Sequence, residues 1–251
     1  MKTFKKRLMD RDLILGTVIT IPAPEVIEIF RDAGLDWFFI DLEHSAMGIK
    51  EAQILMQVAG KDFPCLVRVP SKEEAWIKKA LDIGASGIIL PQVKTAEQAK
   101  RAVSMCKYPT KGERSVGIAR AHDYGNNFNE YVANANQEIA VVIQIEHINA
   151  VENIEKILQV PGIDCVFVGP YDLSASMGKT GQTTDTQVQK AISRITEATK
   201  RADISLGIFG ANTKATQPYI KQGYSLIAVG IDSMLIGNVA QQVVTKFKIH
   251  K

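Results

Sequence analysis

The sequence predicts a single (β/α)₈ barrel over residues 1–251, and three observations favour this fold class. Eight short apolar runs alternate with eight amphipathic segments along the chain. The apolar runs are hydrophobic throughout, as expected for strands that are buried on both faces of a parallel sheet. A length of 251 residues is also typical of such a barrel. An open sheet that binds a dinucleotide is disfavoured, because IPAPEV (21–26) follows the first run in place of a Gly-x-Gly-x-x-Gly sequence.

The first half of the chain contains four of the expected strand–helix pairs. A basic group at 2–7 precedes them, and we interpret it as part of a solvated first helix. Prolines open the next helix and close the third and fourth strands, while glycines follow the helices, because proline fits a helix start and glycine a helix end. The expected strands are 13–20, 37–42, 65–69 and 87–90, and the expected helices are 22–34, 50–60, 73–83 and 95–106.

The second half resumes the alternation after an irregular region at 107–136. This region is rich in Gly, Asn and Tyr, and we expect a long loop with one short helix near 127–135. The Gly-, Ser- and Thr-rich segment after the sixth strand is expected to be another loop. The remaining strands are expected at 139–145, 164–168, 205–209 and 226–229, and the remaining helices at 149–158, 186–202, 213–222 and 234–247.

Composition and charge exclude several classes of protein. The net charge is only +3 and the basic residues are scattered, so nucleic acid is not an expected partner. No run of about 18 apolar residues is present, so no membrane span is expected. Charged residues at 10–12 interrupt the N-terminus before any apolar segment, unlike a signal peptide. The three cysteines form no C-x-x-C pair. We therefore expect a cytoplasmic protein.

Polar side chains gather where the expected strands end. In a (β/α)₈ barrel these ends form the face that carries the active site. Apolar strands seldom end in such groups without a functional reason, so we take them as candidate site residues. They are Asp41 and His44 after the second strand, Arg68 on the third, Gln144 and Glu146 at the fifth, and Tyr171 and Asp172 after the sixth.

Glu146 and Asp172 are the candidate metal ligands. They follow adjacent strands, so their carboxylates can converge, and two hard oxygen donors suit Mg²⁺, Mn²⁺ or a similar divalent ion. The alternative for either residue is a loop cap or a surface ion pair.

His44 and Arg68 are the candidate catalytic residues. A neutral imidazole near a metal can act as a general base, with Asp41 or Glu43 to orient it. Arg68 can stabilise an enolate or a carboxylate. The alternatives are a loop-capping histidine and a buried structural salt bridge. His147 is expected to turn away from the metal.

Six segments in order resemble a known family. They are DLEHS (41–45), RVP (68–70), IKKALDIGASGIILPQV (77–93), ERSVG (113–117), QIE (144–146) and GPYDLSASMG (169–178). Together they are similar to the HpcH/HpaI aldolases, class II pyruvate aldolases of the phosphoenolpyruvate/pyruvate barrel superfamily. The resemblance runs from about residue 16 to residue 237, nearly the whole chain.

The resemblance implies a metal-dependent cleavage of a 2-keto-4-hydroxy acid, such as a 2-keto-3-deoxy sugar or dicarboxylic acid, to pyruvate and an aldehyde. It implies Mg²⁺ or Mn²⁺, with Co²⁺ as a further candidate, and a homo-oligomer, hexameric or trimer-based. Family members of this kind share helices across subunits, so the last helix is a candidate to pack on a neighbouring subunit; from the sequence alone, packing on its own barrel is an equal alternative. The implied roles are metal binding by Glu146 and Asp172, general base catalysis by His44, enolate stabilisation by Arg68, and pyruvate binding by Gln144 and the backbone of Tyr171 and Asp172.

The resemblance also assigns Asp82 to the support of the histidine base. In a regular barrel this residue lies near the end of a helix on the opposite face. We therefore expect it to act on a neighbouring subunit or through a distorted helix, and Asp41 is the local alternative. Arg114 and Arg120, in the loop near 112–125, are candidates to hold a carboxylate or phosphate of the aldehyde half.

Three alternative functions stay open. The same site can decarboxylate oxaloacetate, because loss of CO₂ also leaves pyruvate enolate. A citryl- or malyl-CoA lyase-like activity is a second alternative, although no basic surface for CoA phosphates is evident. A non-catalytic keto-acid binding protein is the third, and it would not need His44. A lysine Schiff base is not expected, because the sixth strand reads CVFV (165–168).

Overall fold

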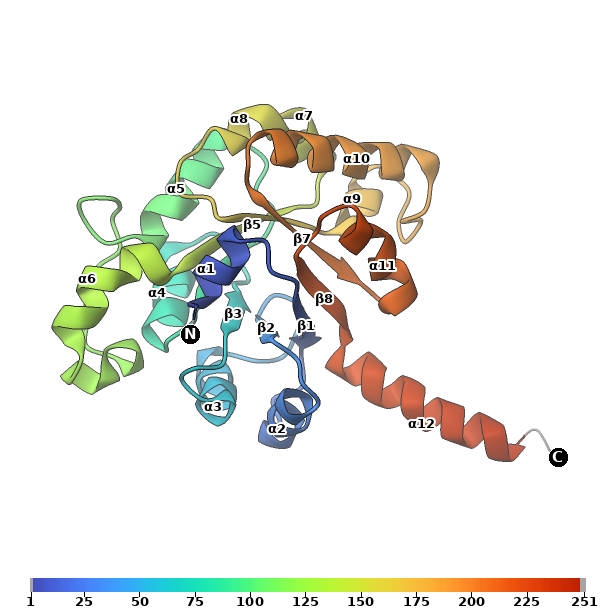
Figure 1. The fold of residues 1–251 in the computed structure, drawn as a ribbon, viewed down its shortest axis with the longest axis horizontal. Coiled ribbons are helices and arrows are strands. Elements are labelled where there is room, and N and C mark those ends of the chain that lie inside the picture. Colours follow the sequence, from blue (N-terminus) through green and yellow to red (C-terminus); the bar gives the residue numbers. More distant parts are fainter. Residues whose placement is uncertain (1, 249–251) are drawn as a thin grey trace.

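The computed structural model describes residues 2–248 and contains a closed barrel of eight parallel strands (Figure 1). Each strand pairs with the next in sequence, and β8 pairs with β1 to close the barrel. The predicted (β/α)₈ fold is confirmed. The strands are β1 (Ile14–Ile19), β2 (Trp37–Asp41), β3 (Cys65–Arg68), β4 (Gly87–Leu90), β5 (Ala140–Ile145), β6 (Cys165–Val168), β7 (Ser205–Gly210) and β8 (Leu226–Ile231).

Helices surround the barrel, and their bounds lie close to the predicted ones. The helices are α1 (Phe4–Met9), α2 (Pro24–Asp32), α3 (Ile49–Ala59), α4 (Glu74–Asp82), α5 (Ala96–Cys106), the 3₁₀ segment η1 (Arg120–Gly125), α6 (Phe128–Glu138), α7 (Ile148–Glu152), α8 (Ile154–Leu158), α9 (Pro170–Ser176), α10 (Thr186–Arg201), α11 (Thr213–Lys221) and α12 (Asp232–Lys248).

Two differences from the sequence expectations concern helices. The segment at 149–158 is two short helices, because Asn153 leaves the helical conformation and its side chain donates to the carbonyls of Lys94 and Asn149. The segment after β6 was expected to be a loop but begins with α9. Pro170 occupies the first turn of α9, a position that proline favours.

The strands separate two apolar cores. Side chains alternate along a strand, so one set points into the barrel and the other toward the helices. On β2, Trp37 and Phe39 belong to the inner core, whereas Phe38 and Ile40 pack in the outer one. Phe4 of α1 joins the inner core, with its ring centroid 6.3 Å from that of Trp37.

The same alternation positions polar side chains at one rim of the barrel. Leu66 belongs to the inner core and Arg68 follows two residues later, so Arg68 also points inward. Asp41 is two residues beyond Phe39 and pairs in register with Arg68. Gln144 continues the inward series of β5 in the same way. The C-terminal end of the barrel is therefore polar inside, while its middle is apolar.

The last helix, α12, extends away from the barrel (Figure 1). The sequence left open whether it packs on its own barrel, and the structure shows that its far half does not. None of the helices within residues 2–248 has the length and apolar character that crossing a membrane requires.

Candidate active site

A pocket of about 230 Å³ opens at the C-terminal ends of the strands. Six of the residues predicted from the sequence line it, and they come from β2, β3, β5 and the start of α9. These six are Asp41, His44, Arg68, Gln144, Tyr171 and Asp172. The structure thus brings most of the candidate site together in one place.

Arg68 is held rigidly in the wall of this pocket. Its Nε donates to Asp41 Oδ1 at 2.9 Å and its Nη2 to Asp41 Oδ2 at 2.6 Å, while Nη1 lies 3.3 Å from Glu43 Oε2. The guanidinium also lies 5.1 Å from the ring centroid of Phe39. The buried salt bridge that competed with a catalytic role is therefore present, and Arg68 still lines the pocket. Such a clamp fixes the direction of the positive charge.

Asp41 and Glu43 contact different parts of His44: Asp41 bonds its backbone, and Glu43 lies near its imidazole. Asp41 Oδ1 accepts from the backbone N–H of Glu43 at 3.0 Å and from that of His44 at 3.4 Å, so Asp41 orients the loop and not the imidazole. Glu43 Oε2 lies 3.9 Å from His44 Nε2. Burial raises the pKa of Glu43, against the lowering influence of Arg68. The side chain of His44 is 63% exposed, which suits a group that exchanges protons with a ligand.

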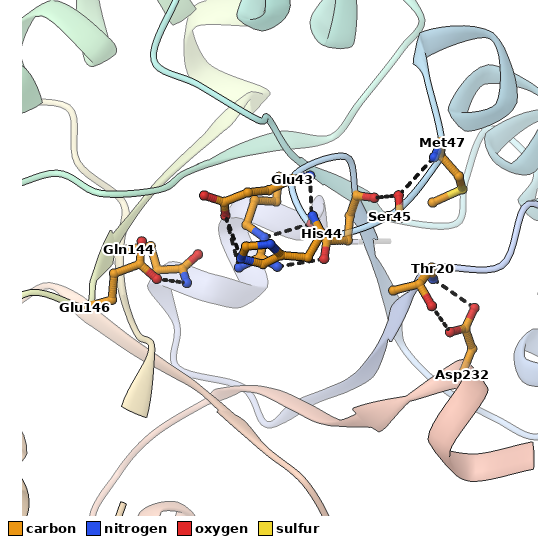
Figure 2. A network of polar contacts seen from close by, with 10 residues as sticks. Thr20, Glu43, His44, Ser45, Met47, Gln144, Glu146 and Asp232 are labelled. Carbon is orange, nitrogen blue, oxygen red and sulfur yellow. Dashed lines mark hydrogen bonds and ion pairs between the residues drawn. The ribbon is translucent and has the colours of Figure 1, made fainter. Parts of the chain in front are cut away.

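Glu146 is buried at the rim, with only 2% of its surface exposed. Its Oε1 accepts from the backbone N–H of Gln92 at 2.7 Å, and its Oε2 accepts from Gln144 Nε2 (Figure 2). Burial raises the pKa of Glu146 to about 7, and the neighbouring carboxylates of Asp172 and Glu43 also raise it. A Cβ at Gly169 would lie 2.9 Å from Glu146 Oε2, so only glycine leaves this carboxylate room.

The donor set at this end of the pocket fits a divalent cation. Two carboxylates, Glu146 and Asp172, interact unfavourably with each other, and a cation between them removes that cost. Among the described residues, the buried Oε1 of Gln144 has no hydrogen-bond donor. Within residues 2–248 no group of three or more His, Cys, Asp or Glu side chains could hold a metal. The protein would therefore supply two hard oxygen ligands and leave the other positions to water or substrate, as Mg²⁺ and Mn²⁺ sites allow.

Four residues that the sequence analysis discussed, Asp82, Arg114, Arg120 and His147, lie away from this pocket. Asp82 is at the end of α4, where its Oδ1 accepts from Arg114 Nη2 at 3.0 Å, so the structure does not place it beside His44 of the same chain. Arg114 is buried and Arg120 donates to backbone carbonyls, so neither cation reaches the pocket of its own chain. His147 caps α7 by accepting from the backbone N–H of Asn149, and it is not among the residues that line the pocket.

Sequence reasoning missed several residues on the other side of the pocket. They are Val18 and Thr20 at the end of β1, Phe209 on β7 and Ile231 at the end of β8. It also missed the backbone N–H of Gln92, which binds Glu146. The inward register of the strands could have identified Thr20, because it lies two residues beyond the inner-core Val18. A backbone donor leaves no signal in the sequence.

The closed barrel, with two carboxylates, an arginine and a histidine at the C-terminal rim, defines the class of protein, a (β/α)₈-barrel enzyme. The chain belongs to the HpcH/HpaI aldolase/citrate lyase family, whose model matches residues 19–238. This confirms the resemblance seen in the six segments.

Individual relatives match over almost their full lengths. A hydroxypyruvate/pyruvate aldolase from Paraburkholderia phytofirmans is 37% identical over 247 residues, which are 95% of this chain and 94% of that protein. A 4-hydroxy-2-oxovalerate aldolase from Rhodococcus jostii is 34% identical and covers 98% of this chain and 95% of its own. The crystal structure of an HpcH/HpaI aldolase/citrate lyase family protein from Burkholderia cenocepacia has a TM-score of 0.93 at 32% identity, covering 97% of this chain and 98% of that chain.

Proposed function

We propose that this protein is a metal-dependent aldolase that cleaves a 2-keto-4-hydroxy acid to pyruvate and an aldehyde. The observation that carries the proposal is the meeting of Asp172, Arg68 and His44 in one pocket, with Glu146 bonded to Gln144 at its wall. The relatives named above are aldolases of 2-keto acids, which supports the same reaction class.

Glu146 and Asp172 would hold the divalent cation, for which Mg²⁺ and Mn²⁺ are the first candidates and Co²⁺ the third. When bound, such an ion supplies a Lewis acid that polarises the keto group of the substrate. Gln144 would bind pyruvate, together with the backbone of Tyr171 and Asp172 at the start of α9. The first-turn N–H groups of a helix are unpaired within the helix and can bind a carboxylate.

The chain's own side chains would move the proton and stabilise the charge. His44, as general base, removes the proton of the 4-hydroxyl group. The C3–C4 bond breaks, the aldehyde leaves, and the electron pair stays on a pyruvate enolate, which is then protonated at C3. Arg68, fixed by Asp41 and Glu43, stabilises the negative charge of the enolate without reorganising. No lysine is among the described residues that line the pocket, so nothing there suggests a Schiff base.

The test uses metal-stripped protein and a panel of 2-keto-4-hydroxy acids, including 2-keto-3-deoxy sugar acids. Pyruvate release is followed through coupling to lactate dehydrogenase, with and without Mg²⁺ or Mn²⁺, and oxaloacetate serves as the competing substrate. We expect release that depends on the metal and survives borohydride treatment in the presence of substrate. Activity that resists exhaustive chelation, or turnover of oxaloacetate alone, would overturn the proposal.

We further propose that α12 packs on a second copy of the chain. Several of its exposed side chains are large and apolar, and the helix extends away from the barrel (Figure 1). They include Ile236, which is 50% exposed, Val239 at 62% and Phe247 at 81%. An apolar face of this kind is typical of a surface that another subunit covers. The family resemblance favours a trimer-based or hexameric assembly.

The proposed compartment is the cytoplasm. All three cysteines are buried free thiols, as expected where the environment keeps thiols reduced.

A further inference from the structure

The hydroxyl group of Thr20 is held in a single orientation at the edge of the pocket. Thr20 Oγ1 donates to Asp232 Oδ1 at 2.6 Å, and the backbone N–H of Thr20 donates to Asp232 Oδ2 at 2.8 Å (Figure 2). Asp232 is fully buried and also accepts from the N–H groups of Ile21 and Ser233, both at 2.7 Å. The carboxylate of Asp232 accepts from the Thr20 hydroxyl and from three backbone N–H groups, so the hydroxyl hydrogen of Thr20 points at this carboxylate. Toward a ligand, Thr20 can then act only as an acceptor.

Thr20 lies on the side of the pocket away from the proposed metal ligands. Glu146 and Asp172 follow β5 and β6, whereas Thr20 and Asp232 follow β1 and β8, which are adjacent to each other in the closed barrel. Figure 2 shows Gln144 and Glu146 on one side of His44 and Thr20 with Asp232 on the other. The part of a substrate that extends beyond its pyruvate unit would therefore meet the Thr20 side.

The rest of that side is apolar. Val18 and Ile231 flank Thr20 along the pocket wall, and the rings of Tyr171 and Phe209 lie next to each other with centroids 5.9 Å apart. A largely apolar wall with a small number of placed polar groups is the usual arrangement by which a binding site selects a functional group on a ligand.

The same side offers no positive charge. Arg68 is the arginine among the described lining residues, and its charge is already paired. Its Nε and Nη2 donate to Asp41, and its Nη1 lies 3.3 Å from Glu43 Oε2. The carboxylates of Asp41 and Asp172 line the pocket as well. A carboxylate or phosphate on the aldehyde would lose its hydration there and find no free cationic partner among the described lining residues of this chain.

We propose that Thr20 is a specificity-determining residue that accepts a hydrogen bond from a hydroxyl group of an uncharged aldehyde, and that Asp232 fixes its hydroxyl in that acceptor orientation. This inference rests on the proposed aldolase function and names the class of its aldehyde substrate. An analogue without the hydroxyl cannot replace the hydrogen bond, so the site discriminates against it.

The test compares two aldehydes of nearly equal size in aldol addition to pyruvate, with the metal-loaded enzyme. Glycolaldehyde carries the hydroxyl group, and propanal has a methyl group in its place. The measured quantity is the ratio of kcat/KM for glycolaldehyde to kcat/KM for propanal, compared between wild type and variants. Comparing ratios cancels the different intrinsic reactivities of the two aldehydes.

Thr20→Val keeps the shape of the side chain and removes the acceptor, while three donors to Asp232 remain. We expect it to lower the ratio by about tenfold with little change for propanal, since a lost hydrogen bond in a binding site typically costs about that factor. Thr20→Ser keeps the hydroxyl and should stay within about twofold of wild type. Succinic semialdehyde, which is charged, should react at least about tenfold less efficiently than glycolaldehyde.

A Thr20→Val enzyme with an unchanged ratio, or one that loses activity equally with both aldehydes, would overturn the role of Thr20. Equal efficiency with succinic semialdehyde would overturn the preference for an uncharged aldehyde. A wild-type enzyme that adds neither aldehyde to pyruvate would instead refute the proposed function, and the inference with it. The two failures are therefore distinguishable.

Discussion

Replacing Glu146 by Gln should stabilise the metal-free protein and abolish its response to metal. The pKa of Glu146 rises from an ordinary value of 4.5 to about 7, mainly because the carboxyl is buried. This difference of about 2.5, at about 1.4 kcal/mol for each pKa unit, corresponds to a penalty of roughly 3–4 kcal/mol for keeping the charged form in the folded state.

The sign of the pH dependence follows from the raised pKa. The folded protein holds the proton of Glu146 more tightly than the unfolded chain does, so the penalty is absent below pH 4.5 and grows until about pH 7. The metal-free wild type should thus lose roughly 3–4 kcal/mol of folding stability over this interval, and Glu146→Gln should not.

The neighbourhood can accept a glutamine at position 146. Its amide oxygen can take the bond from the Gln92 N–H, and its amide nitrogen then faces Gln144. Gln144 Oε1 is buried without a partner, so a flip of the Gln144 amide gives the new N–H an acceptor. The substitution therefore removes the charge and leaves no new unpaired group.

Thermal unfolding in excess EDTA at pH 5 and pH 8 measures the effect. For a chain of this length, roughly 3–4 kcal/mol corresponds to roughly 6–16 °C in Tm. Glu146→Gln should therefore unfold that much higher than wild type at pH 8 and close to wild type at pH 5. Once the EDTA has been removed, Mg²⁺ or Mn²⁺ should raise the Tm of wild type only, because binding to the folded state stabilises it. Glu152→Gln, at an exposed position, is the matched control. Equal Tm values at pH 8, or an undiminished metal response of Glu146→Gln, would refute the reasoning.

Three further predictions concern the catalytic pair and the last helix. His44→Ala should lower kcat by about 10²–10⁴-fold while metal-dependent pyruvate binding, measured by calorimetry, is retained; lost binding would argue against a base. Arg68→Lys should lower kcat by about 10²–10³-fold with a smaller effect on KM, because lysine cannot form both bonds to Asp41; steady-state kinetics that show a change in KM alone would contradict an enolate-stabilising role. Val239→Lys together with Val243→Lys on α12 should shift the assembly toward monomers in light scattering, and an unchanged mass would remove α12 from the subunit contact.

The sequence predicts the fold well because the strands are largely apolar runs and most helices have recognisable ends. It also predicts most of the rim, because polar residues such as Asp41 and Gln144 stand out at the end of such runs. The loss of helical geometry at Asn153 depends on a tertiary bond to the Lys94 carbonyl, which no local pattern reveals. The same holds for the Gln92 amide that binds Glu146.

Thr20 and Asp232 show a different limit of sequence reasoning. They are 212 residues apart, and neither is unusual in its local context. Their contact arises because the barrel closes β8 on β1. A partner across the closure of a barrel is fixed by the whole topology, so the sequence of either segment alone does not indicate it.

The predicted role of Asp82, support of the base His44, requires a second subunit. Within its own chain it lies at the end of α4 and binds the buried Arg114, whose guanidinium stacks 4.4 Å from the ring centroid of Tyr108. A role confined to this ion pair would make Asp82→Asn a stability variant, with a lower Tm and an unchanged pH profile of kcat. A role in the site of a neighbour would instead change the pH profile, because the base would lose a group that raises its basicity.

Mixed oligomers separate these two roles of Asp82. Both Asp82→Asn and His44→Ala should be nearly inactive alone if each site combines His44 of one copy with Asp82 of another. Co-expressed in equal amounts with different tags, the two variants would then form intact sites at about a quarter of the positions, since each of the two residues is intact in half of the copies. Purified hybrids should accordingly regain up to about a quarter of wild-type activity. Hybrids no more active than the mean of the two parent variants would leave Asp82 as a partner of Arg114 alone.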